Sequence, residues 1–152
     1  MDSANIAHPQ FEIPCNVRSE QVVLGCLIED GSLLPCILDS GLNVNSFMLS
    51  DHRRIFQAIL DLHQQSAPID CVTVAERLGN KASDFALLAD LICGVVVDAS
   101  HALYHAKIVR KKAALRKVMK IGEWLQTTAA DASANPEQLT NAAIEKLQGV
   151  RL

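Results

Sequence analysis

A chain of 152 residues with a net charge of −3 is long enough to bury a core of its own, and its overall charge gives no general attraction to nucleic acid. Hydrophobic residues make up 49% of the chain and aromatic residues only 4%, so its core must consist of Leu, Ile, Val and Ala, as in helical proteins. No apolar run reaches the roughly eighteen residues of a membrane span, and we expect a cytoplasmic protein with no membrane partner.

The cysteines and the N-terminus exclude two further classes of protein. The five cysteines are odd in number and include no C-x-x-C pair, so neither a zinc site nor a disulfide framework is indicated, and we expect small buried thiols. Residues 1–15 are polar and contain two prolines, which predicts a flexible tail and not a signal peptide.

Residues 16–98 are predicted to form a compact globule of about five helices. The first helix runs from Val17 to Asp30 with Asn16 as its N-cap, and a short second helix over 33–39 ends at Gly41. Gly25 lies within the first helix at a cost in helix propensity, which usually marks the close approach of a neighbouring helix.

Three more helices complete this predicted globule. The third covers 51–65 with Ser50 as its cap, and the fourth reaches Leu78 from an Asp70 cap. The fifth begins at Ser83 and is closed by Gly94. The valines that follow at 95–97 have no evident strand to pair with, so we expect an extended connector.

The stretch from Ser100 to Ala130 predicts one long helix, capped by Asp98 or Ser100. It contains no proline and a single interior glycine, Gly122. At about 1.5 Å per residue, the helix is roughly 45 Å long, whereas a small domain is roughly 30 Å across. Part of this helix should therefore project from the globule.

The long helix has two apolar sides. At 100° per residue, its main face carries Tyr104, Ile108, Leu115, Val118, Met119, Leu125 and Ala129. A thinner line on nearly the opposite side carries Val109, Ala113 and Trp124. Because one face is enough to join the globule, we expect a following helix, a second copy of the chain, or both, to cover the other. The alternative is a long core helix with one stray tryptophan.

A last helix is predicted to fold back along the long one. Asn135 is its N-cap, Pro136 lies in its first turn, Gln138 completes a capping box, and the helix reaches Gln148. Residues 99–149 would thus form a helical hairpin for oligomerisation, and the whole chain is predicted to be all-α. The expected hairpin and subunit contacts are Tyr104, Ile108, Leu115, Val118, Met119, Trp124, Leu139 and Ile144.

Basic residues concentrate on the long helix and leave a second functional class open. Half of the basic residues of the chain, with no acid among them, are Lys107, Arg110, Lys111, Lys112, Arg116, Lys117 and Lys120. They surround most of the helix and make no single stripe, so a solvated face is favoured. The alternative is a small helical module that binds nucleic acid through this cluster.

No residue pattern predicts catalysis, a cofactor or a metal. A P-loop requires a Gly-Lys dipeptide, and the chain has none. His101 and His105 share a helix face but have no apparent third metal ligand, and position 102 is alanine where a zinc protease needs glutamate. A catalytic pair of His52 with Asp51 would need a nucleophile that the sequence does not place.

Four segments nevertheless resemble the N-terminal domain of bacterial replicative DNA helicases of the DnaB type. They are PCNVRSEQVVLG at 14–25, FMLSDHRRIFQAI at 47–59, PIDCVTVAERL at 68–78 and AKIVRKKAALR at 106–116. The third is the most specific. Against the family pattern, Arg18 and Ser19 replace glutamate and alanine, VDASH replaces Pro-Ser-Ala-Ala-Asn before the long helix, and His105 replaces tyrosine.

The resemblance implies a non-catalytic domain that helps to assemble a hexameric helicase ring. In that family, hairpins of neighbouring subunits pair into a trimer-of-dimers collar, and the domain layer receives the C-terminal domain of primase. A helicase loader is a further implied partner, and DNA would be met through the full-length helicase. The ATP and Mg²⁺ sites would belong to a RecA-like motor that lies outside these residues. The chain is then either an excised domain of such a helicase or a free-standing relative of it.

Overall fold

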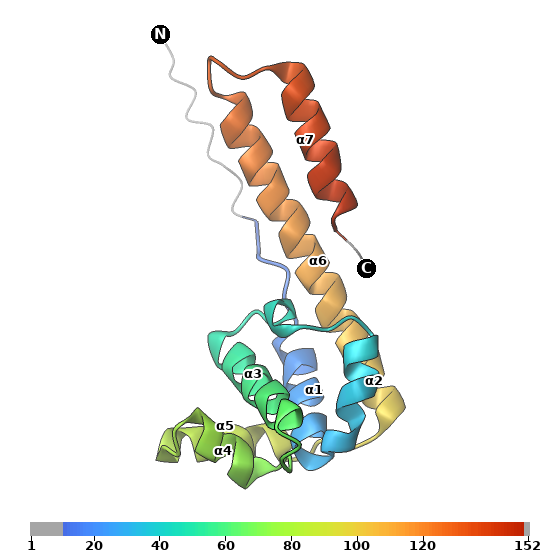
Figure 1. The fold of residues 1–152 in the computed structure, drawn as a ribbon, viewed down its shortest axis with the longest axis vertical. Helices are drawn as coiled ribbons and strands as arrows, with labels where there is room; N and C mark the ends of the chain where they lie inside the picture. The colour runs from blue at the N-terminus through green and yellow to red at the C-terminus, as the bar shows by residue number, and fades with distance from the viewer. Residues whose placement is uncertain (1–10, 151–152) are drawn as a thin grey trace.

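A computed structural model describes residues 11–150, and among them the chain forms α-helices, two 3₁₀ turns and no strand. Helices α1 to α5 make a globule, α6 projects from it as a long rod, and α7 returns antiparallel along the outer part of α6 (Figure 1). We call α6 beyond the globule together with α7 the arm. The predicted all-α fold is confirmed.

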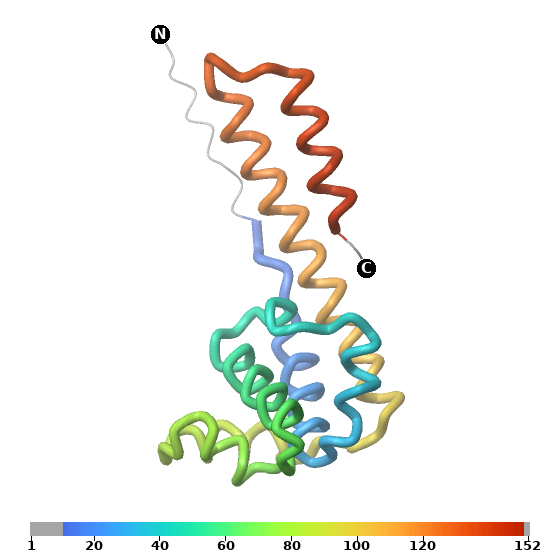
Figure 2. Tube along the Cα trace, in the orientation of Figure 1, coloured from blue at the N-terminus to red at the C-terminus, as the bar shows by residue number. Residues whose placement is uncertain are grey.

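The helices lie close to their predicted positions. Their bounds are α1 (Val17–Glu29), η1 (Gly31–Leu33), α2 (Leu34–Asp39), η2 (Val44–Ser46), α3 (Ser50–Gln64), α4 (Cys71–Leu78), α5 (Ala82–Ile92), α6 (Ala99–Ala129) and α7 (Pro136–Gln148). The predicted tail falls partly outside the described residues, since 1–10 are not among them. Residues 11–15 carry no helix and rise beside α6 (Figure 2).

Side-chain caps start three of these helices as predicted. Asn16 Oδ1 accepts the backbone N–H of Ser19 at 2.9 Å, and Asp98 accepts that of His101 at 2.9 Å. Asp70 accepts the N–H of Thr73 at 2.9 Å, and the Thr73 hydroxyl oxygen accepts the Asp70 N–H in return. Each pair satisfies donors that a helix terminus leaves without partners.

The other predicted caps need correction. Ser50 is the first residue of α3 and makes no capping bond, because Leu49 occupies the cap position. Helix α5 begins one residue before Ser83, and the Asp84 carboxylate accepts the Lys81 N–H at 3.1 Å. A serine close to a helix start does not fix the phase of the first turn, because a neighbouring carboxylate or a backbone turn can begin it instead.

The last helix keeps only half of its predicted capping box. The Asn135 side chain accepts the Gln138 N–H at 3.0 Å, and Pro136 lies at the first position of α7. No bond returns from the Gln138 side chain to the Asn135 backbone among the described residues. One capping bond and the preset proline backbone are enough to begin this helix.

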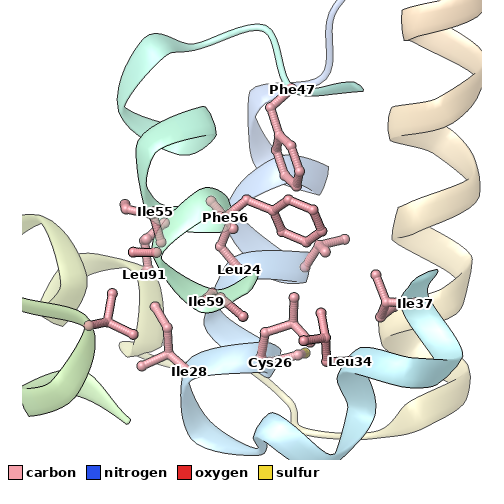
Figure 3. Close-up of a cluster of buried hydrophobic side chains, with 14 of the residues drawn as sticks. Leu24, Cys26, Ile28, Leu34, Ile37, Phe47, Ile55, Phe56, Ile59 and Leu91 are labelled. Atoms are coloured by element: carbon pink, nitrogen blue, oxygen red, sulfur yellow. The ribbon is translucent and has the colours of Figure 1, made fainter. Parts of the chain in front are cut away.

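The core of the globule forms around α1. Leu24, Ile28, Phe56 and Ile59 point into one apolar cluster with residues of α2 and α5 (Figure 3). At Gly25 an added Cβ would lie 2.3 Å from a backbone oxygen of α5, so these two helices touch with no side chain between them. The close approach predicted from Gly25 is confirmed.

Helix α6 joins the globule through small side chains and not through its main apolar face. Ala102, Ala106, Val109 and Ala113 are buried, and the first three belong to the core cluster. Two residues of the thin line therefore meet the globule. Short side chains let the helix approach closely and leave its main face pointing away from the core.

The cysteines are more exposed than expected. All five are free thiols, and only Cys26 is buried, where burial raises its pKa. Cys15, Cys36 and Cys93 are exposed, so the expectation of burial is wrong for them. Among residues 11–150 no single helix could span a membrane, although the bent pair Val17–Glu29 and Gly31–Asp39 passes by length and composition alone.

Candidate assembly surface on the arm

The arm carries an apolar surface that nothing in the described chain covers. Leu115 and Val118 of α6 are each 42% exposed and Ile144 of α7 is 49% exposed, while Tyr104, on the part of α6 that packs on the globule, is 64% exposed. Leu115 and Val118 share a groove of about 680 Å³ with α7, lined by Lys107, Arg110, Lys111, Ala114, Leu115, Val118, Leu147 and Val150. We call this exposed side of the arm, with its groove, the arm face.

The remaining predicted contact residues lie deeper in the arm. Ile108, Met119, Trp124 and Leu139 are half-buried. The Lys146 ammonium lies 4.7 Å from the centre of the Trp124 ring, so part of the contact between the two helices is a cation–π interaction. The subunit contacts themselves stay a prediction.

The sequence placed two groove residues less well than the others. Leu147 and Val150 line the groove but were not among the predicted contacts. Leu147 lies three residues after Ile144 on the same side of the last helix, and this helical spacing could have identified it as a contact residue. Val150 follows the end of α7, where helical spacing no longer gives a direction.

The basic cluster divides into groups that face different surroundings. Arg116 is half-buried and donates to the backbone oxygens of Pro14 at 2.8 Å and Ser46 at 2.6 Å, which fastens α6 to two other segments. Lys107 and Lys111 border the arm groove. Among the described residues none of the seven forms an ion pair. The cluster is therefore no continuous track for a phosphate backbone.

A buried acid–histidine pair holds the globule together and was missed in the sequence. His52 Nδ1 lies 2.7 Å from Glu20 Oε2, and the Met48 N–H donates to Glu20 Oε1 at 2.7 Å. The two side chains are 1% and 3% exposed, so no substrate reaches them, and the partner of His52 is not Asp51. In the sequence, Glu20 and His52 each stand on the apolar side of a predicted helix, beside Val23 and Ile55, and this pattern could have indicated a buried pair.

The second histidine pair lies where α6 enters the globule. The rings of His101 and His105 have centroids 4.7 Å apart, and His105 Nδ1 lies 3.0 Å from Ser19 Oγ. Burial lowers the pKa of His105, and the charge of His101 lowers it further. Two departures from the family pattern, Ser19 and His105, are thus in direct contact. In residues 11–150 no group of three metal-ligating side chains occurs.

Relatives of this chain are helicases several times its length. Replicative DNA helicase DnaB of Rhodothermus marinus is 32% identical over 147 residues, covering 91% of this chain and 15% of the helicase. Replicative DNA helicase DnaB of Buchnera aphidicola subsp. Baizongia pistaciae is 30% identical over 146 residues, covering 92% of this chain and 31% of the helicase. The chain thus spans less than a third of the length of these two relatives.

Solved structures share the fold. The N-terminal domain of DnaB helicase from Mycobacterium tuberculosis superposes with a TM-score of 0.80 at 28% identity, covering 91% of this chain and all of that domain. A DnaB-like replicative helicase, solved for its interactions with primase, superposes with a TM-score of 0.73 over 90% of this chain and 32% of its own. At 21% identity, the second likeness shows the fold alone.

The sequence family agrees with the likeness in structure. The family model described as "DnaB-like helicase N terminal domain" matches residues 12–111, which include the globule and the first part of α6. The matched range contains the first three segments that carried the resemblance in full. It also contains the first part of the fourth segment, up to residue 111. The chain belongs to the DnaB-like helicase N-terminal domain family.

Proposed function

We propose that this domain assembles the subunits of a hexameric helicase ring by pairing its arm with the arm of a second copy. The observation that carries the proposal is the arm face, where Leu115, Val118 and Ile144 are exposed although the globule has a core of its own. Large apolar side chains exposed around a groove mark an interaction site. Burying one large side chain such as Leu115 contributes about 1.5 to 3 kcal/mol.

The charge along the arm favours an antiparallel pair. All seven basic residues of the cluster lie between 107 and 120, near the globule, whereas residues 121–146 contain four acidic residues, Glu123, Asp131, Glu137 and Glu145, and one basic residue, Lys146. Parallel arms would place like charges side by side. Antiparallel arms bring the basic base of each copy to the acidic outer part of the other, which lowers the repulsion and adds attraction.

Light scattering after size-exclusion chromatography tests the pairing. The wild-type chain should elute as a dimer or a larger assembly, and Leu115→Asp should shift it toward monomer with its helicity retained. Val72→Asp is the matched control, because Val72 is 65% exposed on α4 of the globule. A wild-type chain that is strictly monomeric at high concentration, or an equal loss of assembly in both variants, would contradict the proposal.

We extend the proposal to the partners of the parent helicase. The assembled layer would receive the C-terminal domain of primase and a helicase loader, while the motor region of the parent chain would bind ATP, Mg²⁺ and DNA in the bacterial cytoplasm. Primase is the first partner to test, because a DnaB-like replicative helicase that shares this fold was solved for its interactions with primase. Adding the cognate primase domain should give a larger particle in the same light-scattering experiment.

A second function is favoured by the unpaired lysines of α6. Lys107, Lys111, Lys117 and Lys120 are exposed, and no carboxylate pairs with them among the described residues. If they bind nucleic acid, a mobility shift at low salt should fall steeply as salt is added, because each phosphate contact releases counterions. The low aromatic content leaves few side chains on which bases could stack.

A further inference from the structure

A second cavity lies at the junction where the arm leaves the globule. It is a half-open hollow of about 370 Å³. Three segments surround it: the loop before and within η2, the side of α6 that faces this loop, and the end of α7. We call it the neck pocket, and its lining residues are Gly41, Asn43, Asn45, Ser46, Arg110, Ala113, Ala114, Lys117 and Gly149.

The neck pocket is cationic. Arg110 and Lys117 are seven residues apart, so both lie on the same side of α6, and no carboxylate belongs to the lining. Neither residue forms an ion pair in the part of the chain that the structure describes. Two positive charges therefore line one half-open pocket whose lining contains no carboxylate.

The loop opposite these charges is rigid and polar. Asn43 Oδ1 accepts the Asn45 N–H at 3.0 Å, and Ser46 Oγ accepts the Asn43 N–H at 3.1 Å. These bonds use the oxygen of Asn43, and among the described residues the side-chain NH₂ groups of Asn43 and Asn45 donate to no protein group. The loop, whose backbone these bonds hold, thus adds amide NH₂ donors to the two cations across the pocket.

The position of the Arg110 guanidinium depends on Gly41. Gly41 has a φ of +86°, a conformation that side-chain-bearing residues rarely adopt. A Cβ added there would lie 3.1 Å from Arg110 Cζ and 3.2 Å from its Nε. The guanidinium therefore packs directly against the Gly41 backbone, which orders it before any ligand arrives.

We propose that the neck pocket binds a free phosphoryl anion of the size of pyrophosphate. A planar guanidinium, an ammonium and amide NH₂ groups are donors that match phosphoryl oxygens, and charge-assisted bonds are the strongest of this kind. The lining contains no aromatic side chain, so it offers a nucleobase nothing to stack on. A bound anion touches the η2 loop, α6 and the end of α7, and thereby fixes the arm to the globule.

Amide chemical shifts of the 152-residue chain, followed during a pyrophosphate titration at constant ionic strength, test this site. Saturable shifts are expected in residues 41–46 and 110–117. Lys117→Gln should weaken binding by about tenfold or more, since a hydrogen bond to a charged group is worth at least about a tenfold change in affinity. Lys120→Gln is the matched control, because it removes the same charge from α6 outside the neck pocket.

A second variant lowers the positive charge of the pocket without a change in side-chain size. Asn45→Asp places a carboxylate beside Arg110 and Lys117 in the lining and should weaken the saturable binding while circular dichroism shows an unchanged fold. The proposal is overturned if the shifts do not saturate, if Lys117→Gln and Lys120→Gln lose affinity equally, or if Asn45→Asp binds like the wild type. It is also overturned if a short oligothymidylate perturbs the same amides at lower concentration than pyrophosphate, because the ligand is then a strand and not a free anion.

Discussion

Removing one partner from the buried pair of Glu20 and His52 should be among the most destabilising single changes in the globule. Glu20 accepts two hydrogen bonds, from His52 and from the Met48 N–H, and its side chain is 1% exposed. His52→Leu removes one of the two and leaves the carboxylate buried beside a single donor. Breaking a buried pair in this way costs about 3 to 5 kcal/mol. That is a large fraction of the roughly 5 to 15 kcal/mol by which a domain is stable.

Urea unfolding followed by circular dichroism measures this cost. With a slope of about 2 kcal/mol per M, a loss of 3 to 5 kcal/mol lowers the midpoint by roughly 2 M. His63→Leu, on the exposed side of the same helix, is the control and should change stability by less than about 0.5 kcal/mol. All variants are compared at one protein concentration, so that self-association contributes equally.

The double variant Glu20→Leu/His52→Leu separates the pair from its surroundings. It removes both partners at once and leaves only the Met48 N–H without an acceptor, at about 1 to 3 kcal/mol. Its cost should therefore be smaller than the sum of the two single costs. Additive costs, or a loss below about 1 kcal/mol in His52→Leu alone, would refute the reasoning.

Three further changes probe other contacts of the fold. Gly25→Ala should destabilise the domain by about 1 to 3 kcal/mol in the same urea experiment, because its Cβ would lie 2.3 Å from a backbone oxygen. Gly122→Ala is the control, and it should raise the free energy of unfolding by about 0.5 to 1 kcal/mol because its Cβ would meet open space. Equal effects of the two variants would contradict the contact. The pKa of His105 is lower in the folded chain than its unfolded value of about 6.5, so the unfolded chain binds more protons. The free energy of unfolding should therefore fall as the pH drops below about 6.5. His105→Gln should flatten this pH dependence between pH 6.5 and 5. Arg116→Ala should free the segment at Pro14, seen as faster amide exchange after residue 14, and unchanged exchange would show that its bonds do not hold the segment.

Local chemistry in the sequence was enough to determine the helices. Asn16, Asp70 and Asp98 predicted helix starts that the structure confirms, because a cap depends on atoms two or three residues away. The projecting rod likewise follows from the sequence between Ser100 and Ala130, since helix length is fixed by the rise per residue. The predicted start at Ser83 was wrong by one residue, because the helix begins at Ala82 and the Asp84 carboxylate accepts the Lys81 N–H.

Tertiary structure decided which groups meet across the chain. The sequence showed two apolar sides on α6, but only the fold reveals that Val109 and Ala113 meet the globule while Leu115 and Val118 remain exposed. The contacts of Glu20 with His52, of Ser19 with His105 and of Arg116 with Ser46 join residues 32, 86 and 70 positions apart. Helical periodicity gives the direction of a side chain about its own axis, whereas its partner depends on how separate helices pack, and that is settled by the summed burial of the whole core.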